Sequence, residues 1–112
     1  SGLSRYNLLT PRSVVFLWNK IYSLVPKERL FGMLATGGKS GTIRNWYNGD
    51  GDKPYIFGKT GTLRHNHCLS GYLVSRSGKT LIFSFMNNNF TVPQNDIRKN
   101  MQTILNLIYE NY

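Results

Sequence analysis

The stretch that decides the expected fold is Tyr55-Ile56-Phe57-Gly58-Lys59-Thr60-Gly61-Thr62. Aromatic and β-branched residues in its first half show the alternation of a short β-strand. Its second half differs in chemistry, because Lys59 is a cation with three donors and Thr60 and Thr62 place two hydroxyls on one face of the strand. Gly61 lets a ligand or another backbone approach closely. The stretch therefore predicts a strand whose end recognises an anion.

Two more strands are expected downstream of this stretch. Residues 68–75 and 79–87 are rich in apolar side chains on both faces, and the turn residues Arg76-Ser77-Gly78 separate them. Residues 64–67 are predicted to form a polar connection. An antiparallel sheet that is apolar on both faces must be covered on both sides. The sequence therefore predicts a three-stranded antiparallel meander between layers of helix.

Helices are predicted on either side of the meander. Thr10-Pro11 is a typical helix start, and Pro26 ends a helix predicted over residues 11–24, with apolar positions Val14, Leu17, Trp18, Ile21 and Val25. Residues 27–34 predict a shorter helix, and residues 36–42 a glycine-rich loop. Pro93 opens a long last helix, whose apolar stripe is Ile97, Met101, Ile104, Leu105, Ile108 and Tyr112. The layout predicts an α+β fold.

The composition limits the function without deciding it. A chain of 112 residues, 40% of them hydrophobic, can build the core of one domain. Its 14 Lys and Arg against 5 Asp and Glu favour an acidic partner, such as nucleic acid, an anionic surface or a carboxylate-bearing substrate. The basic residues are scattered and no nucleic-acid motif is present, so no nucleic-acid partner is expected. A basic nucleic-acid or anionic-surface binding module without catalytic activity stays as the alternative hypothesis. No apolar run approaches the length of a transmembrane segment.

Two other patterns fail on their spacing. Gly-Lys-Ser/Thr occurs at Gly38, Gly58 and Gly78, but none has the glycine five residues earlier that a phosphate loop requires. The histidines and the thiol of His65-Asn66-His67-Cys68 have no second cluster with which to complete a metal site. Cys68 has no placed orienting acid either, as a catalytic thiol would need. We therefore predict no metal site and no cofactor.

Lys59-Thr60-Gly61 matches the Lys-Thr-Gly element of the penicillin-recognising serine enzymes. Lys39-Ser40-Gly41-Thr42 fits the same pattern but lies in a loop, whereas Lys59 ends an apolar strand, so we assign the motif to Lys59. The chain resembles the low-molecular-mass class C penicillin-binding proteins, which are bacterial D-alanyl-D-alanine carboxypeptidase/endopeptidases. This resemblance runs in order through residues 1–8, Thr10-Pro11-Arg12, Gly41-Thr42-Ile43-Arg44, 58–63, 69–73 and 81–84. Lys39-Ser40 departs from it, because relatives often carry an acidic residue before that glycine.

The resemblance implies a β-lactamase/transpeptidase-like fold, of which residues 1–112 are the C-terminal part of a domain. It implies a periplasmic or cell-envelope enzyme that cleaves peptidoglycan stem peptides ending in D-Ala-D-Ala through an acyl-enzyme and is acylated by β-lactams. Lys59 and Thr62 are the implied catalytic residues, with the Thr62 N–H as half of the oxyanion hole. The Thr60 and Thr62 hydroxyls would hold the substrate carboxylate, and Gly61 would keep the strand edge open.

The family's Ser-x-x-Lys and Ser-x-Asn motifs are not found in this sequence. No serine has lysine three residues on or asparagine two residues on, and in the family both motifs lie upstream of the stretch that opens this chain. We therefore expect a C-terminal piece of the enzyme that is inactive alone. Because the family's sheet has five strands, the strand from Lys79 to Asn87 should have an open edge through which copies of the chain associate.

Overall fold

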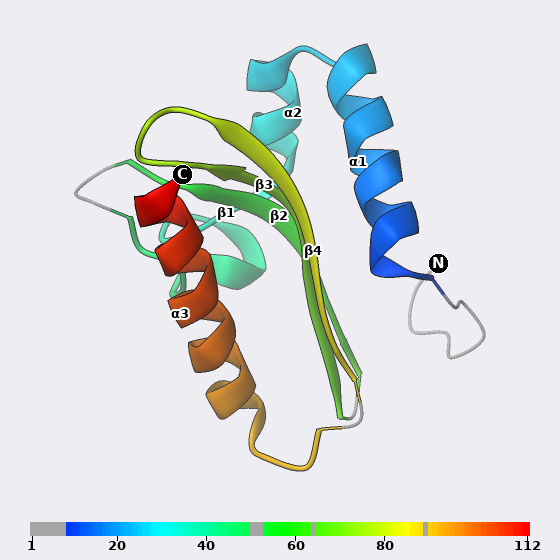
Figure 1. The fold of residues 1–112 in the computed structure, drawn as a ribbon, viewed down its shortest axis with the longest axis vertical. Coiled ribbons are helices and arrows are strands. Elements are labelled where there is room, and N and C mark those ends of the chain that lie inside the picture. Colours follow the sequence, from blue (N-terminus) through cyan, green and yellow to red (C-terminus); the bar gives the residue numbers. More distant parts are fainter. Residues whose placement is uncertain (1–8, 50–52, 64, 89) are drawn as a thin grey trace.

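The computed structural model describes residues 9–49, 53–63, 65–88 and 90–112. Within these ranges an antiparallel sheet with the strand order β1-β2-β3-β4 has α1 and α2 on one face and α3 on the other (Figure 1). The elements are α1 (Pro11–Leu24), α2 (Lys27–Met33), β1 (Ala35–Thr36), the 3-10 helix η1 (Gly41–Ile43), β2 (Ile56–Leu63), β3 (Asn66–Val74), β4 (Thr80–Asn88) and α3 (Gln94–Asn111). The predicted α+β fold is confirmed.

The sheet contains one strand more than the predicted meander. Ala35 and Thr36 form β1, which pairs with Gly58 and Phe57 of β2. The Gly37 N–H then donates to the carbonyl of Ile56 over 2.9 Å. Two residues are too few to show an alternating pattern, so β1 lies in a segment whose glycines predict a loop.

The hairpin between β2 and β3 is tighter than the sequence predicts. β3 begins at Asn66, which pairs with Leu63, and His65 adopts a φ of 62° in the turn. A two-residue connection matches the twist of antiparallel strands, so no longer polar connection is needed. The prediction for His67 was wrong: it lies inside β3 and is 2% exposed.

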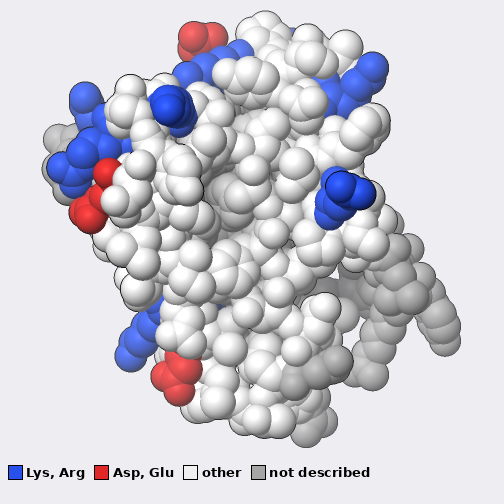
Figure 2. Space-filling view, in the orientation of Figure 1, with Lys and Arg blue, Asp and Glu red and all other residues white. Residues whose placement is uncertain are grey.

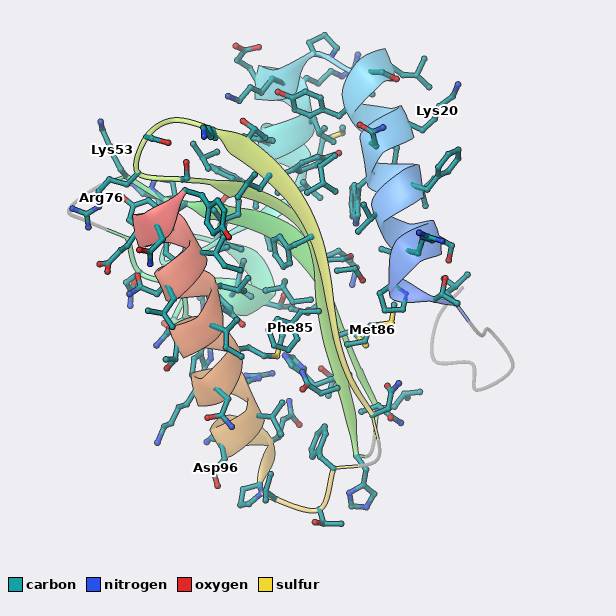
Figure 3. All side chains as sticks on the ribbon, in the orientation of Figure 1. Lys20, Lys53, Arg76, Phe85, Met86 and Asp96 are labelled. Carbon is teal, nitrogen blue, oxygen red and sulfur yellow. The ribbon has the colours of Figure 1, made fainter. Side chains whose placement is uncertain are left out.

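The two faces of the sheet are covered by different helices, as the apolar pattern predicts. Phe85 and Met86 are neighbours on β4 that point to opposite faces, Phe85 toward α3 and Met86 toward α1 (Figure 3). On the face toward α3, the buried core includes Ile56, Leu69, Leu73, Met101 and Leu105. On the other face, the buried Tyr72 donates to the carbonyl of Trp18 in α1 over 2.6 Å, and the Trp18 indole donates to Ser70 over 2.9 Å.

The helices begin and end close to their predicted residues. The Thr10 hydroxyl accepts from the Ser13 N–H at the start of α1, and Pro11 takes the first helical position.

The buried faces of the helices differ in detail from the predicted apolar stripes. Three stripe members are largely exposed, and Tyr109, which the stripe omits, is buried against Tyr55 with ring centroids 4.7 Å apart. The exposed members are Leu17, Ile104 and Tyr112. The apolar stripe is wider than the surface that the sheet covers.

Candidate functional site

The second half of β2 has an edge without a partner strand among the described residues. β1 pairs with Phe57 and Gly58 and reaches no further along β2. The Val74 N–H donates to Tyr55 and the Gly37 N–H donates to Ile56, each over 2.9 Å. Because antiparallel residues alternate in direction, odd-numbered residues of β2 face β3 and even-numbered residues face the other edge. The backbone N–H and C=O groups of Thr60 and Thr62 are therefore directed to the open edge.

Lys59 and Gly61 point to the α1 side of the sheet. Lys59 is opposite Ser70 in the register, and Ser70 accepts from Trp18 of α1. The Lys59 side chain is exposed, and its ammonium bends to the edge, where it donates to the Thr60 carbonyl over 2.6 Å. A Cβ at Gly61 would meet no described atom within 4 Å. This side of the strand is therefore open next to a cation.

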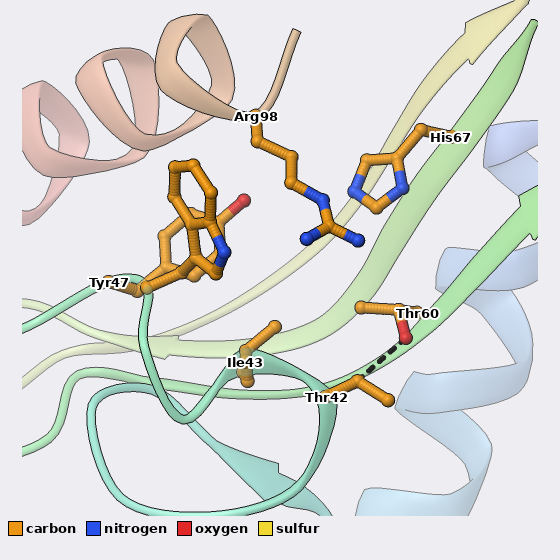
Figure 4. A pocket seen from close by; sticks show the side chains of 7 residues that line it. Thr42, Ile43, Tyr47, Thr60, His67 and Arg98 are labelled. Carbon is orange, nitrogen blue, oxygen red and sulfur yellow. Dashed lines mark hydrogen bonds between the residues drawn. The ribbon is translucent and has the colours of Figure 1, made fainter. Parts of the chain in front are cut away.

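Thr60 meets a residue that the sequence analysis left without a role. Its hydroxyl is hydrogen-bonded to the hydroxyl of Thr42, in η1, over 2.7 Å (Figure 4). Thr42 ends the second Lys-Ser-Gly-Thr stretch, which we set aside as a loop. The fold thus brings one hydroxyl from each of the two similar motifs together, 18 residues apart. The resemblance over Gly41-Thr42-Ile43-Arg44 was the signal for Thr42, but spacing alone does not predict this contact.

Thr62 lies opposite His67 in the register of β2 and β3, and its hydroxyl is 2.8 Å from His67 Nδ1. The His67 ring is on the α3 side of the sheet. Burial lowers the pKa of His67, and the guanidinium of Arg98 lowers it further. His67 is therefore neutral near pH 7. Its hydrogen bond holds the hydroxyl of a site residue that is itself exposed.

Arg98 of α3 is a further residue that sequence reasoning missed. Its guanidinium points toward His67 and Thr60 in Figure 4 and lies 5.7 Å from the centroid of the Trp46 ring. Arg98 Nε and the Tyr47 hydroxyl are buried and have no hydrogen-bond partner among the described residues. Burial raises the pKa of Tyr47 to about 12, although Arg98 opposes this rise. Arg98 is one of many polar residues on α3, so nothing local marked it.

The space between these groups is small. About 10 Å³ remains among the side chains of Thr42, Ile43, Trp46, Tyr47, Thr60, His67 and Arg98. A volume of this size accommodates one water at most. The side chains behind Thr60 therefore form a packed polar support that leaves no room for a ligand between them.

Other kinds of site find little support in the described part of the chain. No group of three or more His, Cys, Asp or Glu there is arranged to hold a metal ion. None of the described helices combines the length and the apolar character needed to cross a membrane. On the face shown in Figure 2, Lys and Arg occur in separate places, with acidic side chains among them. This distribution does not favour the nucleic-acid alternative.

Comparison with known proteins identifies the family of this chain. Residues 1–108 match the D-Ala-D-Ala carboxypeptidase 3 (S13) family. The chain is 35% identical over 98 residues to a D-alanyl-D-alanine carboxypeptidase of Actinomadura sp. (strain R39), covering 83% of this chain and 18% of that protein. The resemblance to low-molecular-mass penicillin-binding proteins is therefore confirmed.

Two solved structures share the fold. Penicillin-binding protein 4 of Haemophilus influenzae in complex with a β-lactam gives a TM-score of 0.84 at 22% identity, over 98% of this chain and 28% of that one. A second structure of the same protein gives a TM-score of 0.80 at 24% identity, over 98% of this chain and 26% of that one. The chain thus spans less than a third of the length of each relative. It belongs to the D-Ala-D-Ala carboxypeptidase 3 (S13) family.

Proposed function

We propose that this chain forms the substrate-side wall of a serine acyl-transfer site in a penicillin-binding D-Ala-D-Ala carboxypeptidase/endopeptidase. One observation carries the proposal. Lys59, Thr60 and Thr62 gather an ammonium, two hydroxyls and two edge-directed backbone N–H groups at the unpaired part of β2. This set of donors suits a terminal carboxylate together with a carbonyl that becomes an oxyanion.

Each residue of the strand end has its own role. A serine supplied by another part of the whole protein attacks the carbonyl between two D-alanines, and water later releases the acyl group. The Thr62 N–H faces the open edge and donates to the developing oxyanion. Lys59 contacts the serine of the Ser-x-Asn motif and adds positive potential near the substrate carboxylate. Gly61 leaves room for the substrate backbone.

The two threonine hydroxyls bind the substrate carboxylate while keeping their partners within the chain. A hydroxyl has one donor and two acceptor positions, so Thr60 and Thr62 each retain capacity beyond the single contacts to Thr42 and His67. The partners are peptidoglycan stem peptides ending in D-Ala-D-Ala and β-lactams, which also carry a carboxylate. Such substrates place the protein in the periplasm or cell envelope.

Substitution of the lysine tests this assignment. In the whole protein, Lys59→Ala should sharply slow labelling by fluorescent penicillin, because the cation beside the edge is lost. Lys39→Ala is the matched control, since Lys39 belongs to the similar Lys-Ser-Gly-Thr stretch and is exposed. We expect labelling of that control at the normal rate. Unchanged labelling of Lys59→Ala would remove the basis of the proposal.

The chain by itself should neither hydrolyse stem peptides nor become acylated by penicillin. No serine in it is followed by lysine three residues on or asparagine two residues on, and stoichiometric acylation in a mass spectrum would contradict this expectation.

β4 ends the strand order, and its residues are half-buried over most of its length. An open edge of this kind pairs with other strands. We therefore propose self-association through β4, and sedimentation of a dilute, folded monomer would contradict it.

A further inference from the structure

The hydroxyl of Thr62 is held by His67, and His67 in turn lies beside Arg98. His67 contacts it from β3 over 2.8 Å, and Arg98 of α3 lines the small space beside His67 and points toward that ring (Figure 4). His67 is almost completely buried, whereas Thr62 is exposed. The arrangement thus places an imidazole between a half-buried cation and a hydroxyl at the open edge. The inference below rests on the function proposed for that edge.

Arg98 does not bind the substrate carboxylate directly. The space beside it is about 10 Å³, which is too small for a carboxylate group and close to the lower limit for one water. Its Nε is buried, and the Trp46 ring lies 5.7 Å from the guanidinium carbon. Any effect of Arg98 on the site must therefore pass through the side chains that it faces, and among these His67 is the one hydrogen-bonded to Thr62.

The cation decides which nitrogen of the neutral His67 ring carries the proton. A neutral imidazole has one N–H and one lone pair. His67 Nδ1 is the atom bonded to Thr62, so the other nitrogen, Nε2, is left toward Arg98 (Figure 4). A guanidinium favours a lone pair facing it and disfavours an N–H facing it, because Arg has donors and no acceptor. The proton is therefore on Nδ1, which donates to Thr62 Oγ1.

This tautomer sets the direction in which the Thr62 hydroxyl donates. With its oxygen accepting from His67, the Thr62 hydrogen is free to point to the open edge. With the opposite tautomer, Thr62 would donate into the sheet and present lone pairs to an incoming carboxylate, which would repel it. We propose that His67, oriented by Arg98, is a positioning residue that keeps the Thr62 hydroxyl a donor toward the carboxylate of the substrate or β-lactam.

The tautomer is measured by nitrogen NMR of the whole protein labelled with [15N]histidine. His67→Asn identifies the His67 signals by their disappearance. We expect proton-bearing Nδ1 and unprotonated Nε2 at pH 7 to 8. A proton on Nε2 in the wild-type protein would overturn the proposal. This readout does not depend on any activity of the protein.

The carboxylate dependence is measured with a penicillin and its methyl ester. His67→Leu removes the donor, and we expect it to slow acylation by the free acid ~10-fold or more, the scale of one hydrogen bond to a charged group. Acylation by the ester should change less than ~2-fold, since the ester carries no charge for the hydroxyl to bind. His67→Asn places an amide N–H near the position of Nδ1 and should restore most of the rate for the free acid.

The outcomes separate this inference from the proposed function. His65→Asn is the matched control, because His65 is exposed and its φ of 62° suits asparagine. Equal slowing of both penicillins by His67→Leu would show a merely structural role and overturn the inference, as would no slowing at all. Absence of acylation in the wild-type protein would instead refute the proposed function, and the NMR result would still decide the tautomer.

Discussion

Replacing one backbone N–H of β2 by an ester oxygen tests whether the open edge takes part in catalysis. The alternation along β2 directs the Thr62 N–H to the open edge and the Gly61 N–H to Cys68 of β3. Loss of an oxyanion donor costs on the order of 3–4 kcal/mol of activation free energy, or about 10²–10³ in rate. Loss of one ladder hydrogen bond costs only about 1 kcal/mol of folding free energy. An ester at Thr62 should therefore lower mainly the acylation rate, and an ester at Gly61 mainly the folding stability.

The assay is the rate constant for acylation by fluorescent penicillin, measured beside thermal unfolding in the whole protein. The ester at Thr62 keeps the side chain and should slow acylation ~100-fold or more with little loss of stability. The ester at Gly61 is the control and should lower stability by about 1 kcal/mol while changing the rate only a few-fold. Similar rates for the two ester proteins would refute the assignment of the oxyanion donor to Thr62.

Two further predictions concern the sheet and its polar support. Gly71→Ala should destabilise the whole protein by about 3 kcal/mol in urea unfolding. The reason is that Gly71 has a φ of 149° and a Cβ there would lie 2.2 Å from the carbonyl oxygen of Phe57. Gly32→Ala in α2 is the control and should not destabilise the protein, because a Cβ there meets nothing within 4 Å. Arg98→Met should raise the pKa of His67 in an NMR titration, because the cation that disfavours the protonated ring is removed. An unchanged pKa in Arg98→Met would show that burial alone sets it.

Local signals in the sequence were sufficient for most of the fold. Thr10, Pro11 and Pro26 mark the limits of α1, and the predicted and observed bounds coincide. The limits of β2, β3 and β4 were predicted to within two residues, because apolar and β-branched runs bounded by turn residues are a strong strand signal. β1 escaped prediction because pairing of two residues depends on the partner strand and leaves no period in the sequence.

Some residues of the candidate site could be proposed from the sequence, and others were found only in the structure. Lys59, Thr60, Gly61 and Thr62 form one continuous motif at the end of a strand, so the sequence alone was enough to propose them as site residues. Thr42, His67 and Arg98 reach the motif from η1, β3 and α3. His67 was misplaced by one short turn, which moved it from a predicted surface connection into the buried register opposite Thr62.

The sequence by itself determined the elements, the apolar faces and the cation-hydroxyl-glycine motif, because each depends on neighbours along the chain. Only the tertiary structure decided which edge of β2 is open and which residues support its hydroxyls. The reason is that strand register and helix packing join residues far apart in the sequence, and neither leaves a local pattern. The family resemblance is the basis of the chemistry proposed for the motif, and the fold places His67 and Arg98 behind it.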